Sequence, residues 1–374
     1  MRIIITGGGT GGHVYPAIAT ADELRAKMDN PEILFVGTKS GLEADLVPKA
    51  GYRLATIVVS GVERRFSLKA FKALGAMMVG GWQAAALLRR FRPDVVIGTG
   101  GYVCGPVVLF AHLFGIPTLI CEQNVIPGVT NRLLGRFADI VCVTYEASRR
   151  YFPARTRVVV TGNPIRREIT LVSRAAGRRN LGIDPAQRVV FVVGGSVGAK
   201  KLNEAMTDVY RSFRKRRDIT FIHVTGKDKY EGSLARLREI GIDIQSAGNI
   251  ILKPYLYNVA DAYAAADLIV CRAGGITLSE VTAVGLPAVL IPYPFATNNH
   301  QYHNARHLEQ AGAAVLLSDD ALSGAGLTDI LDRLLSDPGE LSAMGEKCRS
   351  LGHPKAVDEI AELALSLPKS LGGQ

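Results

Sequence analysis

Cysteine is scarce in this sequence, and its arrangement excludes the usual cysteine frameworks. The 374 residues include five cysteines, an odd number, and no two have the C-x-x-C spacing typical of zinc and redox sites. We therefore expect buried, reduced thiols in a reducing compartment, with no disulfide framework and no metal centre. No cofactor is expected either.

Long uncharged runs are also few, and one of them needs interpretation. Residues 95–121 contain no Asp, Glu, Lys or Arg, and this length is sufficient to span a bilayer. Glycines and prolines interrupt the run, so we expect a strand, a glycine loop, a buried helix and a second strand instead. The apolar run at the N-terminus is too short for the core of a signal peptide.

Acidic residues are outnumbered, mainly in the first half of the chain. The net charge is +10, and residues 1–160 hold 19 Lys and Arg against 11 Asp and Glu. Nucleic acid, anionic lipid or a phosphorylated substrate would each account for this excess. No motif typical of nucleic-acid binding accompanies it, so nucleic acid is not an expected partner.

The chain contains a crude internal duplication. Residues 3–5 form an apolar run that leads into the glycine-rich loop 7–12, and residues 189–193 lead into a second loop, 194–199. Each copy has the pattern of a buried strand, a glycine loop and a helix, which is how a Rossmann-type unit begins. The sequence therefore predicts an α/β protein with two Rossmann-like domains.

After each of these two strand–loop–helix units, further apolar, β-rich runs alternate with helical patterns. This alternation predicts two parallel sheets, each covered by helices, and the two domains are expected to face each other across a cleft. The predicted strands are 33–36, 95–97, 118–121, 140–143 and 158–160 in the first half and 219–224, 250–252, 268–271 and 288–291 in the second. We expect domains at 1–163 and 164–345 and a helical tail at 346–374 that packs back on the first domain. Residues 171–188 are interpreted as the connection into the second domain.

The first glycine loop matches G-x-G-x-x-G at Gly7, Gly9 and Gly12, a pattern that alone is weak evidence for a dinucleotide. A dinucleotide enzyme also needs an acidic residue at the end of the second strand, and this strand ends in Gly-Thr-Lys. A dehydrogenase is therefore disfavoured. His13 follows the loop, either as a packing or capping residue or as a polar group beside bound substrate.

A second glycine cluster, residues 98–106, follows a strand of the first half. Loops at this end of a parallel sheet bind ligands, so a diphosphate that is not part of the nucleotide would fit there; ordinary tight turns are the alternative. Residues 122–124, Glu-Gln-Asn, follow the next strand. They are candidates for hydroxyl recognition with Glu122 as a general base, or else the first turn of a helix.

Residues 271–301 carry the strongest nucleotide signal. A strand leads into a Gly-Gly pair and a helix, whose N-terminus and Thr277 hydroxyl suit phosphate oxygens. Glu280 lies further along this helix and is predicted to accept hydrogen bonds from ribose hydroxyls. Gln301 suits sugar hydroxyls because an amide both donates and accepts. Ser196, in the second glycine loop, is predicted to face the same diphosphate.

Taken together, these segments resemble the MurG family over nearly the whole chain. The resemblance rests on GGTGGHVYP (8–16), EADLVP (43–48), PDVVIGTGGYVCGP (93–106), EQN (122–124), GNPIR (162–166), GGSVGA (194–199) and CRAGGITLSE (271–280). It implies the GT-B fold and an inverting transfer of N-acetylglucosamine from UDP-N-acetylglucosamine to the muramyl 4-hydroxyl of lipid I, giving lipid II. No metal is obligatory in that family.

The resemblance also implies two sets of substrate contacts, with His13 and Glu122 as candidate bases. The implied donor contacts are Thr10, Gly11, Gly12, Asn124, Arg166, Ser196, Leu256, Gly275, Ile276, Thr277, Leu278, Ser279, Glu280 and Gln301. The acceptor contacts are Gly100, Gly101, Tyr102 and Asn131. The chain departs from many relatives at His300, where they have glutamine, and in the loop 254–259.

Residues 64–92 suggest contact with a membrane. Seven basic residues flank an apolar stretch that contains Trp82, and no acidic residue interrupts them. This composition suits an anionic membrane interface, although a core helix with a solvated basic end would look similar. With the lipid-linked acceptor, it predicts a peripheral protein on the cytoplasmic face of the bacterial inner membrane.

Two other functions remain open at this point. One is a related GT-B transferase that makes a glycolipid from diacylglycerol, and the other is a non-catalytic subunit that binds a nucleotide sugar. Glu122, Glu280 and Gln301 occur together in one chain, which argues against a non-catalytic role.

Overall fold

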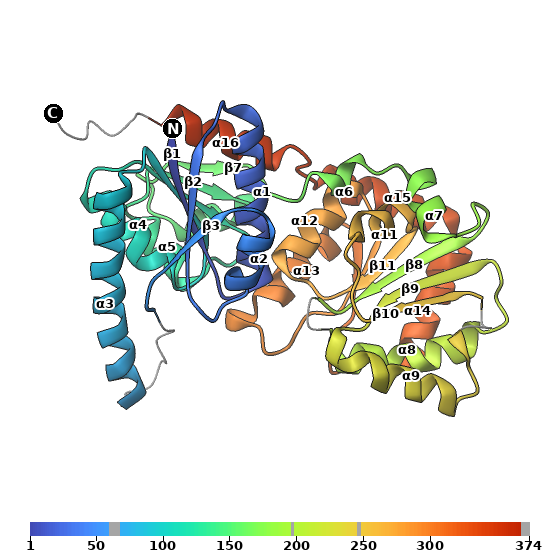
Figure 1. Ribbon diagram of the computed structural model, residues 1–374. Coiled ribbons are helices and arrows are strands. Elements are labelled where there is room, and N and C mark those ends of the chain that lie inside the picture. Colours follow the sequence, from blue (N-terminus) through green and yellow to red (C-terminus); the bar gives the residue numbers. More distant parts are fainter. Residues whose placement is uncertain (60–67, 196–197, 245–247, 368–374) are drawn as a thin grey trace. The chain divides into compact units, whose positions relative to one another are not determined.

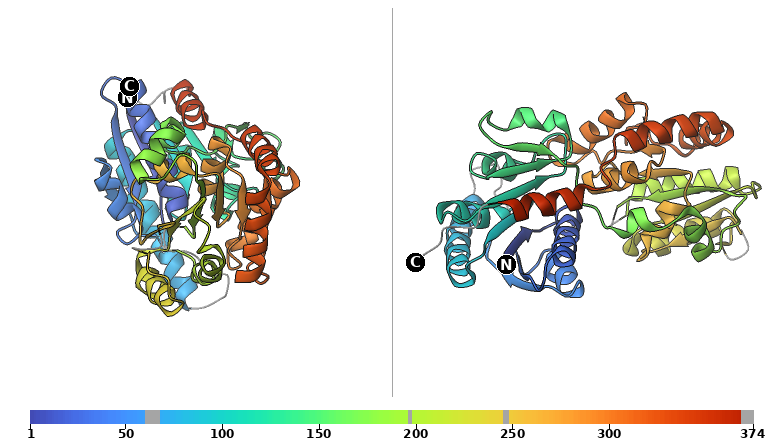
Figure 2. Two further views of the ribbon diagram at one scale, coloured as in Figure 1. Left: turned by 90° about the vertical axis from the view of Figure 1, so that its right-hand side faces the viewer. Right: turned by 90° about the horizontal axis from the view of Figure 1, so that it is seen from above.

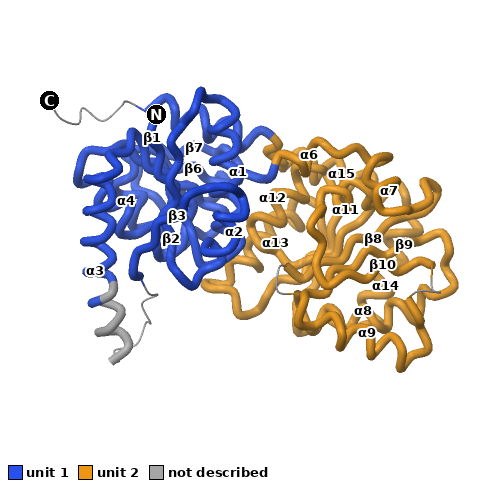
Figure 3. The backbone as a smooth tube through the Cα atoms, viewed as in Figure 1, with its two compact units in different colours: residues 1–166, 355–374 blue, residues 167–354 orange. Residues whose placement is uncertain are grey.

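The computed structural model describes residues 1–59, 68–195, 198–244 and 248–367. Within these ranges the chain folds into two compact units (Figure 3). Unit 1 consists of Met1–Arg166 and the returning segment Lys355–Gln374, and unit 2 consists of Arg167–Pro354. The observed limits lie slightly beyond residues 163 and 345, where the sequence places them.

Unit 1 is built around seven parallel strands in the order β3-β2-β1-β4-β5-β6-β7 (Figure 1). The strands are β1 (Arg2–Gly7), β2 (Glu32–Gly37), β3 (Arg53–Thr56), β4 (Val95–Gly100), β5 (Thr118–Glu122), β6 (Ile140–Val143) and β7 (Val158–Val160). All predicted strands of this half are confirmed, and β3 is an additional edge strand. The order reverses between β1 and β4, which is where doubly wound sheets bind ligands.

Helices cover both faces of this sheet. They are α1 (Gly11–Lys27), α2 (Glu43–Lys49), α3 (Leu68–Phe91), α4 (Cys104–Leu113), α5 (Val129–Leu134), the 3-10 turn η1 (Glu146–Tyr151) and α16 (Ala356–Ser366). Ile3 and Ile5 pack with α1, α2 and α16, whereas Ile4 packs with α3, α4 and α5 on the opposite face. Because successive side chains of a strand alternate between faces, one apolar run fills two cores.

The last helix, α16, returns the chain to unit 1 (Figure 2). Ile360, Ala361 and Ala364 are fully buried in the same cluster as residues of α1 and β1. Lys27 of α1 forms an ion pair with Asp358 of α16 at the surface. The C-terminal helix is therefore part of the core of unit 1.

Unit 2 contains six parallel strands in the order β10-β9-β8-β11-β12-β13. They are β8 (Arg188–Val193), β9 (Ile219–Val224), β10 (Ile250–Lys253), β11 (Leu268–Cys271), β12 (Ala288–Leu290) and β13 (Ala314–Leu316). All predicted strands of this half are confirmed, and β13 is an additional edge strand. Here the order reverses between β8 and β11, so each unit has the Rossmann-like arrangement that the sequence predicts.

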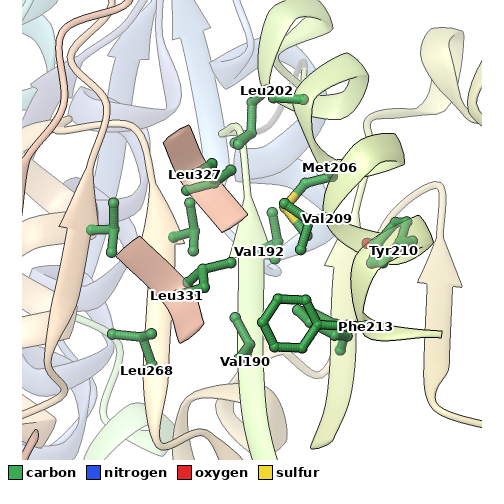
Figure 4. Packing of buried hydrophobic residues seen from close by; sticks show 14 of the residues in the cluster. Val190, Val192, Leu202, Met206, Val209, Tyr210, Phe213, Leu268, Leu327 and Leu331 are labelled. Carbon is green, nitrogen blue, oxygen red and sulfur yellow. The ribbon is translucent and has the colours of Figure 1, made fainter. Parts of the chain in front are cut away.

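The helices of unit 2 also lie on both faces. They are α6 (Glu168–Leu171), α7 (Arg174–Leu181), α8 (Lys200–Phe213), η2 (Lys227–Lys229), α9 (Tyr230–Glu239), α11 (Val259–Ala265), α12 (Gly275–Val284), η3 (Thr297–Asn299), α13 (His300–Gln310), α14 (Gly324–Ser336) and α15 (Pro338–Ser350). Figure 4 shows Val190 and Val192 of β8 packed between side chains of α8 and α14. On the other face, the Phe191 ring lies edge-on to Tyr263 of α11.

The segment 171–188, interpreted from its sequence as a connection, instead contains α7, which packs tightly on α11. A Cβ at Gly177 would lie 2.6 Å from the Asp261 carbonyl oxygen, so glycine permits this close approach. Arg178 is 4% exposed and forms an ion pair with Asp267 at 3.0 Å. The basic residues of this segment thus include a structural one.

Residues 95–121 form β4, α4 and β5, as predicted. In the part of the chain that the structure describes, no helix combines the length and the apolarity needed to cross a membrane. All five cysteines are buried free thiols.

Candidate functional site

The two glycine loops of unit 1 lie against each other at the point where the strand order reverses. The Gly8 N–H donates to the Gly100 carbonyl oxygen at 3.3 Å. Gly101 has a φ of +90°, and a Cβ there would lie 2.5 Å from the Gly8 carbonyl oxygen. Glycine is therefore required at Gly101 both by its backbone conformation and by the close packing of the loops.

His13 lies in the first turn of α1, beside both loops. Its Nδ1 is 2.9 Å from the Gly8 carbonyl oxygen, and a Cβ at Gly100 would lie 2.6 Å from its Cδ2. Because a carbonyl oxygen only accepts, Nδ1 must carry the proton of this hydrogen bond. In the neutral ring, Nε2 is then a proton acceptor. The side chain is half-buried.

Thr10, Gly11 and Gly12 surround the same helix start. Thr10 is exposed at the end of the loop, and its Oγ1 lies 3.3 Å from His13 Nδ1. Gly11 and Gly12 open α1 and are half-buried. Three predicted donor contacts and one candidate base therefore lie together at the N-terminus of α1.

Glu122 is a buried carboxylate that organises the loop after β5. Its Oε1 accepts from the Asn124 N–H at 2.9 Å and from the Asn124 amide at 3.1 Å. Its Oε2 accepts from the Gly128 N–H at 3.0 Å and from Asn131 Nδ2 at 2.9 Å. Burial raises the pKa of Glu122, although these hydrogen bonds act in the opposite direction. Four donors thus occupy a carboxyl group that is 2% exposed.

Asn131 and Tyr102 are the two predicted acceptor contacts with polar side chains. Asn131 is 3% exposed, and its Oδ1 has no hydrogen-bond partner among the described residues. A buried amide oxygen without a partner is costly unless a ligand or water occupies it. Tyr102 is 63% exposed and follows Gly101 directly. Both residues therefore suit the predicted contact with a polar acceptor.

In unit 2, the strand-to-helix connection after β11 has the geometry of a phosphate site. Gly274 is the N-cap of α12 in an extended conformation and, as a glycine, has no side chain of its own to cap the helix. The helix start thus presents backbone N–H groups and partial positive charge. Gly275 is buried, and Ile276 and Thr277 are half-buried in this first turn.

Three residues of α12 that are predicted donor contacts have buried side chains. The Leu278 N–H donates to the Gly274 carbonyl oxygen, and its side chain is fully buried. The Ser279 hydroxyl donates to the Gly275 carbonyl oxygen at 2.9 Å. Glu280 is 5% exposed and accepts from the Tyr263 hydroxyl at 2.9 Å. The structure therefore supplies Glu280 with a partner, Tyr263, that sequence patterns did not indicate.

The loop that ends at Gln301 is held by residues that sequence analysis missed. Gln301 Oε1 accepts from the Tyr293 N–H at 2.9 Å. Arg272 donates to the Ile291 and Pro292 carbonyl oxygens and to Asp319 Oδ1, the last at 2.6 Å. A basic residue between a buried strand and a Gly-Gly pair was the available signal. His300 Nδ1 lies 2.7 Å from the Thr297 carbonyl oxygen, a contact between the first residue of α13 and the preceding turn η3.

Ser196 lies outside the described residues, but the base of its loop is defined. A Cβ at Gly198 would lie 1.9 Å from the Thr225 carbonyl oxygen, which accepts from Asn203 Nδ2 at 3.0 Å. Asn203 Oδ1 lies 3.1 Å from His223 Nε2, and His223 Nδ1 lies 2.8 Å from the Tyr210 hydroxyl. Burial lowers the pKa of His223 to about 3, so the ring is neutral in the folded protein.

The remaining predicted contacts are Arg166, Leu256 and Gly100. The Arg166 guanidinium stacks over the Tyr15 ring with 5.3 Å to the centroid. Leu256 is half-buried in the loop after β10, next to Tyr257, which is 83% exposed. Gly100 has a φ of +111° and contacts the His13 ring, as described above.

Family models match both halves of the chain. The glycosyltransferase family 28 N-terminal domain matches residues 3–143, and the glycosyltransferase family 28 C-terminal domain matches residues 189–360. The matched residues include both glycine loops of unit 1 and the β11–α12 connection of unit 2.

Curated relatives match over nearly the full length. The UDP-N-acetylglucosamine–N-acetylmuramyl-(pentapeptide) pyrophosphoryl-undecaprenol N-acetylglucosamine transferase of Desulforamulus reducens is 47% identical and covers 96% of this chain and 97% of its own length. The protein of the same name from Moorella thermoacetica is 47% identical and covers 99% of this chain and 100% of its own length.

Solved structures agree with this assignment. The crystal structure of Acinetobacter baumannii MurG has a TM-score of 0.75 at 29% identity and covers 98% of this chain and 99% of its own. A UDP-GlcNAc 2-epimerase from Neisseria meningitidis, with a TM-score of 0.67 at 15% identity over 98% and 100% of the two chains, shares the fold. The chain therefore has the GT-B fold and belongs to the MurG family of glycosyltransferases.

Proposed function

We propose that this protein transfers N-acetylglucosamine from UDP-N-acetylglucosamine to the muramyl 4-hydroxyl of lipid I, with inversion at the sugar carbon, and so forms lipid II for the bacterial cell wall. The 47% identity to curated transferases over 96% of the chain carries this proposal. The two alternatives, another GT-B glycolipid transferase and a non-catalytic subunit, have no comparable observation in their favour.

The donor is assigned to unit 2. UDP leaves with developing negative charge, and the uncapped start of α12 presents the backbone N–H groups that stabilise such charge. Glu280, oriented by Tyr263, is assigned to the ribose hydroxyls, and Gln301 to the hydroxyls of N-acetylglucosamine. Ser196 is assigned to the diphosphate, and Arg166, the last residue of the first segment of unit 1, remains a donor contact implied by the family resemblance.

His13 is assigned as the general base. Its Nδ1 donates to Gly8, which leaves Nε2 of the neutral ring to take the proton of the attacking hydroxyl. Glu122, the other candidate, already accepts four hydrogen bonds and is 2% exposed. We assign Glu122 to positioning Asn124 and Asn131, because a carboxylate with four donors has little remaining capacity to accept a proton.

The acceptor is assigned to the loops of unit 1. Gly100 and Gly101 adopt positive φ values that bring the backbone close to a ligand, and Tyr102 is exposed beside them. The unpartnered Oδ1 of Asn131 suits a hydroxyl or amide N–H of the acceptor. A diphosphate at this glycine cluster, as the sequence predicts, would belong to the lipid-linked substrate.

A peripheral contact with an anionic membrane surface is part of this proposal. Apolar side chains are exposed on unit 1, notably Trp82 at 75% and Met78 at 66% on α3 and Leu113 at 63% on α4. A groove of about 440 Å³ near α5 is lined by Arg132 and Arg136 among other residues. Exposed apolar and basic groups together suit an anionic bilayer, and the cytoplasmic face of the inner membrane is the proposed location.

Part of the segment 64–92, which is predicted to contact the membrane, lies outside the described residues. Residues 64–67 and the side chains of Lys69 and Lys72 lie outside the part that the structure describes. In the described part of α3, Ala84 and Leu88 are buried while Trp82 is exposed, which is compatible with both the core helix and the membrane interface.

The direct test is incubation of the purified protein with labelled UDP-N-acetylglucosamine and lipid I in detergent or liposomes. We expect a labelled lipid product whose digestion releases a β-linked disaccharide. Transfer to diacylglycerol but not to lipid I would contradict the assigned acceptor, and hydrolysis of the donor alone would contradict transfer.

A further inference from the structure

A buried carboxylate, Glu43, lies beneath the first glycine loop of unit 1. Glu43 is the first residue of α2 and is 0% exposed. Its Oε2 accepts from the Gly9 N–H at 2.9 Å. Its Oε1 accepts from the Thr38 N–H at 2.9 Å and from the Thr38 hydroxyl at 2.7 Å. One side chain thus ties the loop after β1 to the loop after β2.

Glycines enclose this carboxylate. A Cβ would lie 2.5 Å from a Glu43 carboxyl oxygen at Gly8 and 2.1 Å from one at Gly41. At Gly37 a Cβ would lie 2.5 Å from Glu43 Cγ. The three glycines have φ values outside the left-handed region, so space for Glu43 is the physical reason for glycine at these positions. The local sequence is therefore fitted to a buried acidic side chain.

A single peptide group connects Glu43 with His13. The Gly8 carbonyl and the Gly9 N–H belong to the same peptide bond. The N–H donates to Glu43, and the carbonyl oxygen accepts from His13 Nδ1 at 2.9 Å. A carboxylate on the N–H side polarises the amide and strengthens its carbonyl as an acceptor, because hydrogen bonds in a chain reinforce one another at low dielectric.

We propose that Glu43 is a positioning residue for the reaction: through the Gly8–Gly9 peptide it holds His13 in the tautomer with the proton on Nδ1, so that Nε2 is the ring nitrogen that can accept the proton of the acceptor hydroxyl. The inference rests on the proposed function for its catalytic consequence. The arrangement corresponds to a carboxylate that orients a catalytic histidine, with one peptide group inserted between them.

The ionised state of Glu43 fits this role. Burial raises the pKa of Glu43, but the hydrogen bonds from Thr38 and Gly9 outweigh burial and lower the pKa below its ordinary value. The group is therefore a carboxylate at neutral pH. Because Glu43 takes the Gly9 N–H, that N–H is not available to a nucleotide phosphate, although the loop matches the dinucleotide pattern.

The test compares three variants. Glu43→Gln removes the charge, and its amide cannot accept at both oxygens, so a donor at Gly9 or Thr38 loses its partner. Gly41→Ala keeps the charge but adds a Cβ 2.1 Å from the carboxylate. Asp45→Asn is the matched control, since Asp45 lies on the same short helix and pairs with Lys49 at the surface. Circular dichroism and UDP binding confirm that each variant is folded.

We expect Glu43→Gln and Gly41→Ala to lower kcat by about 10–100-fold, as misplaced catalytic groups do, while KM for UDP-N-acetylglucosamine and all parameters of Asp45→Asn stay at wild-type values. Nitrogen NMR of histidine-labelled protein, assigned with His13→Asn, gives the tautomer directly. The wild type should show the Nδ1–H form of His13, and both variants a shift toward Nε2–H.

Wild-type kcat in the two variants overturns the inference, and so does a loss of kcat without a change in the His13 tautomer, because that outcome indicates a merely structural role. The base assignment is tested separately by His13→Ala. If this variant keeps its activity, while Glu43→Gln still shifts the tautomer of His13 relative to the wild type, then His13 is not the base but its link to Glu43 stands. The two failures are thus distinguishable.

Discussion

The hydroxyl of Tyr263 donates to Oε2 of Glu280 at 2.9 Å, and both side chains are nearly fully buried. Tyr263 lies on α11 and Glu280 on α12, so the bond joins two helices of unit 2. A long side chain such as glutamate loses conformational freedom when it binds a ligand, and a fixed partner reduces that loss. Tyr263 therefore orients the carboxylate that we assign to ribose.

This relationship predicts how UDP affinity responds to substitution. Tyr263→Phe should weaken UDP binding by about 1 kcal/mol, the usual contribution of one hydrogen bond, and Glu280→Gln by about 1.5–3 kcal/mol, because its bonds involve a charge. Tyr230→Phe, on α9, is the matched control and should bind as the wild type does. Isothermal calorimetry with UDP measures all three, and equal affinity in Glu280→Gln would remove the ribose assignment.

The two candidate bases of unit 1 are predicted to respond differently to substitution. His13→Ala should lower kcat by about 10²–10⁴-fold, the usual contribution of a general base, and leave both UDP affinity and thermal stability unchanged. Glu122→Gln should instead lower the free energy of unfolding by about 1–3 kcal/mol, because an amide cannot accept four hydrogen bonds and leaves buried donors without partners.

Kinetics and thermal melts of the same two proteins provide the comparison. A stable Glu122→Gln variant with a large loss of kcat, together with a nearly active His13→Ala variant, would reverse the assignment. Asp139, a carboxylate at the start of β6 that accepts from Thr118, offers Asp139→Asn as a control for loss of a structural acid.

The sequence predicted most of the fold because buried parallel strands are continuous apolar runs. Each predicted strand was confirmed for this reason. The two strands that were missed, β3 and β13, are short edge strands of four and three residues. β3 has no fully buried residue, so its pattern did not differ from that of a loop.

The buried side chains that hold loops and helices in place were harder to predict, because their contacts join residues far apart in the sequence. Glu43 reaches Gly9 across 34 positions, and Arg178 reaches Asp267 across 89. No local pattern distinguishes such acids and arginines from surface charges, since their burial depends on the three-dimensional packing. Motifs located the glycine loops, but not the side chains that hold them.

Acid is predicted to weaken unit 2 locally through His223. Its pKa is about 3 in the folded protein because the ring is buried, against 6.5 for an exposed ring. Between these values the unfolded segment binds a proton that the folded one does not, so stability falls as pH falls, by about 1.4 kcal/mol per pH unit. Above pH 6.5 this dependence should vanish.

Hydrogen exchange of the β9 amides between pH 4 and 7 measures this effect after correction for the intrinsic exchange rate. His223→Gln is the control, because its amide offers a donor toward Asn203 and an acceptor toward Tyr210 without titrating. The variant should lose the pH dependence. The same slope in the variant and the wild type would show that another group is responsible.

Membrane contact should depend on the exposed tryptophan of α3. Trp82→Ser removes an aromatic side chain that is 75% exposed, and we expect about 10–100-fold weaker partition into anionic liposomes, which corresponds to burial of one large apolar side chain. Leu171→Ser, at an apolar residue of unit 2 that is 68% exposed, is the matched control and should partition as the wild type does. Raised salt should weaken binding of all three proteins because basic residues contribute. Equal losses in both variants would show that exposed apolar area in general, and not this face of unit 1, contacts the lipid.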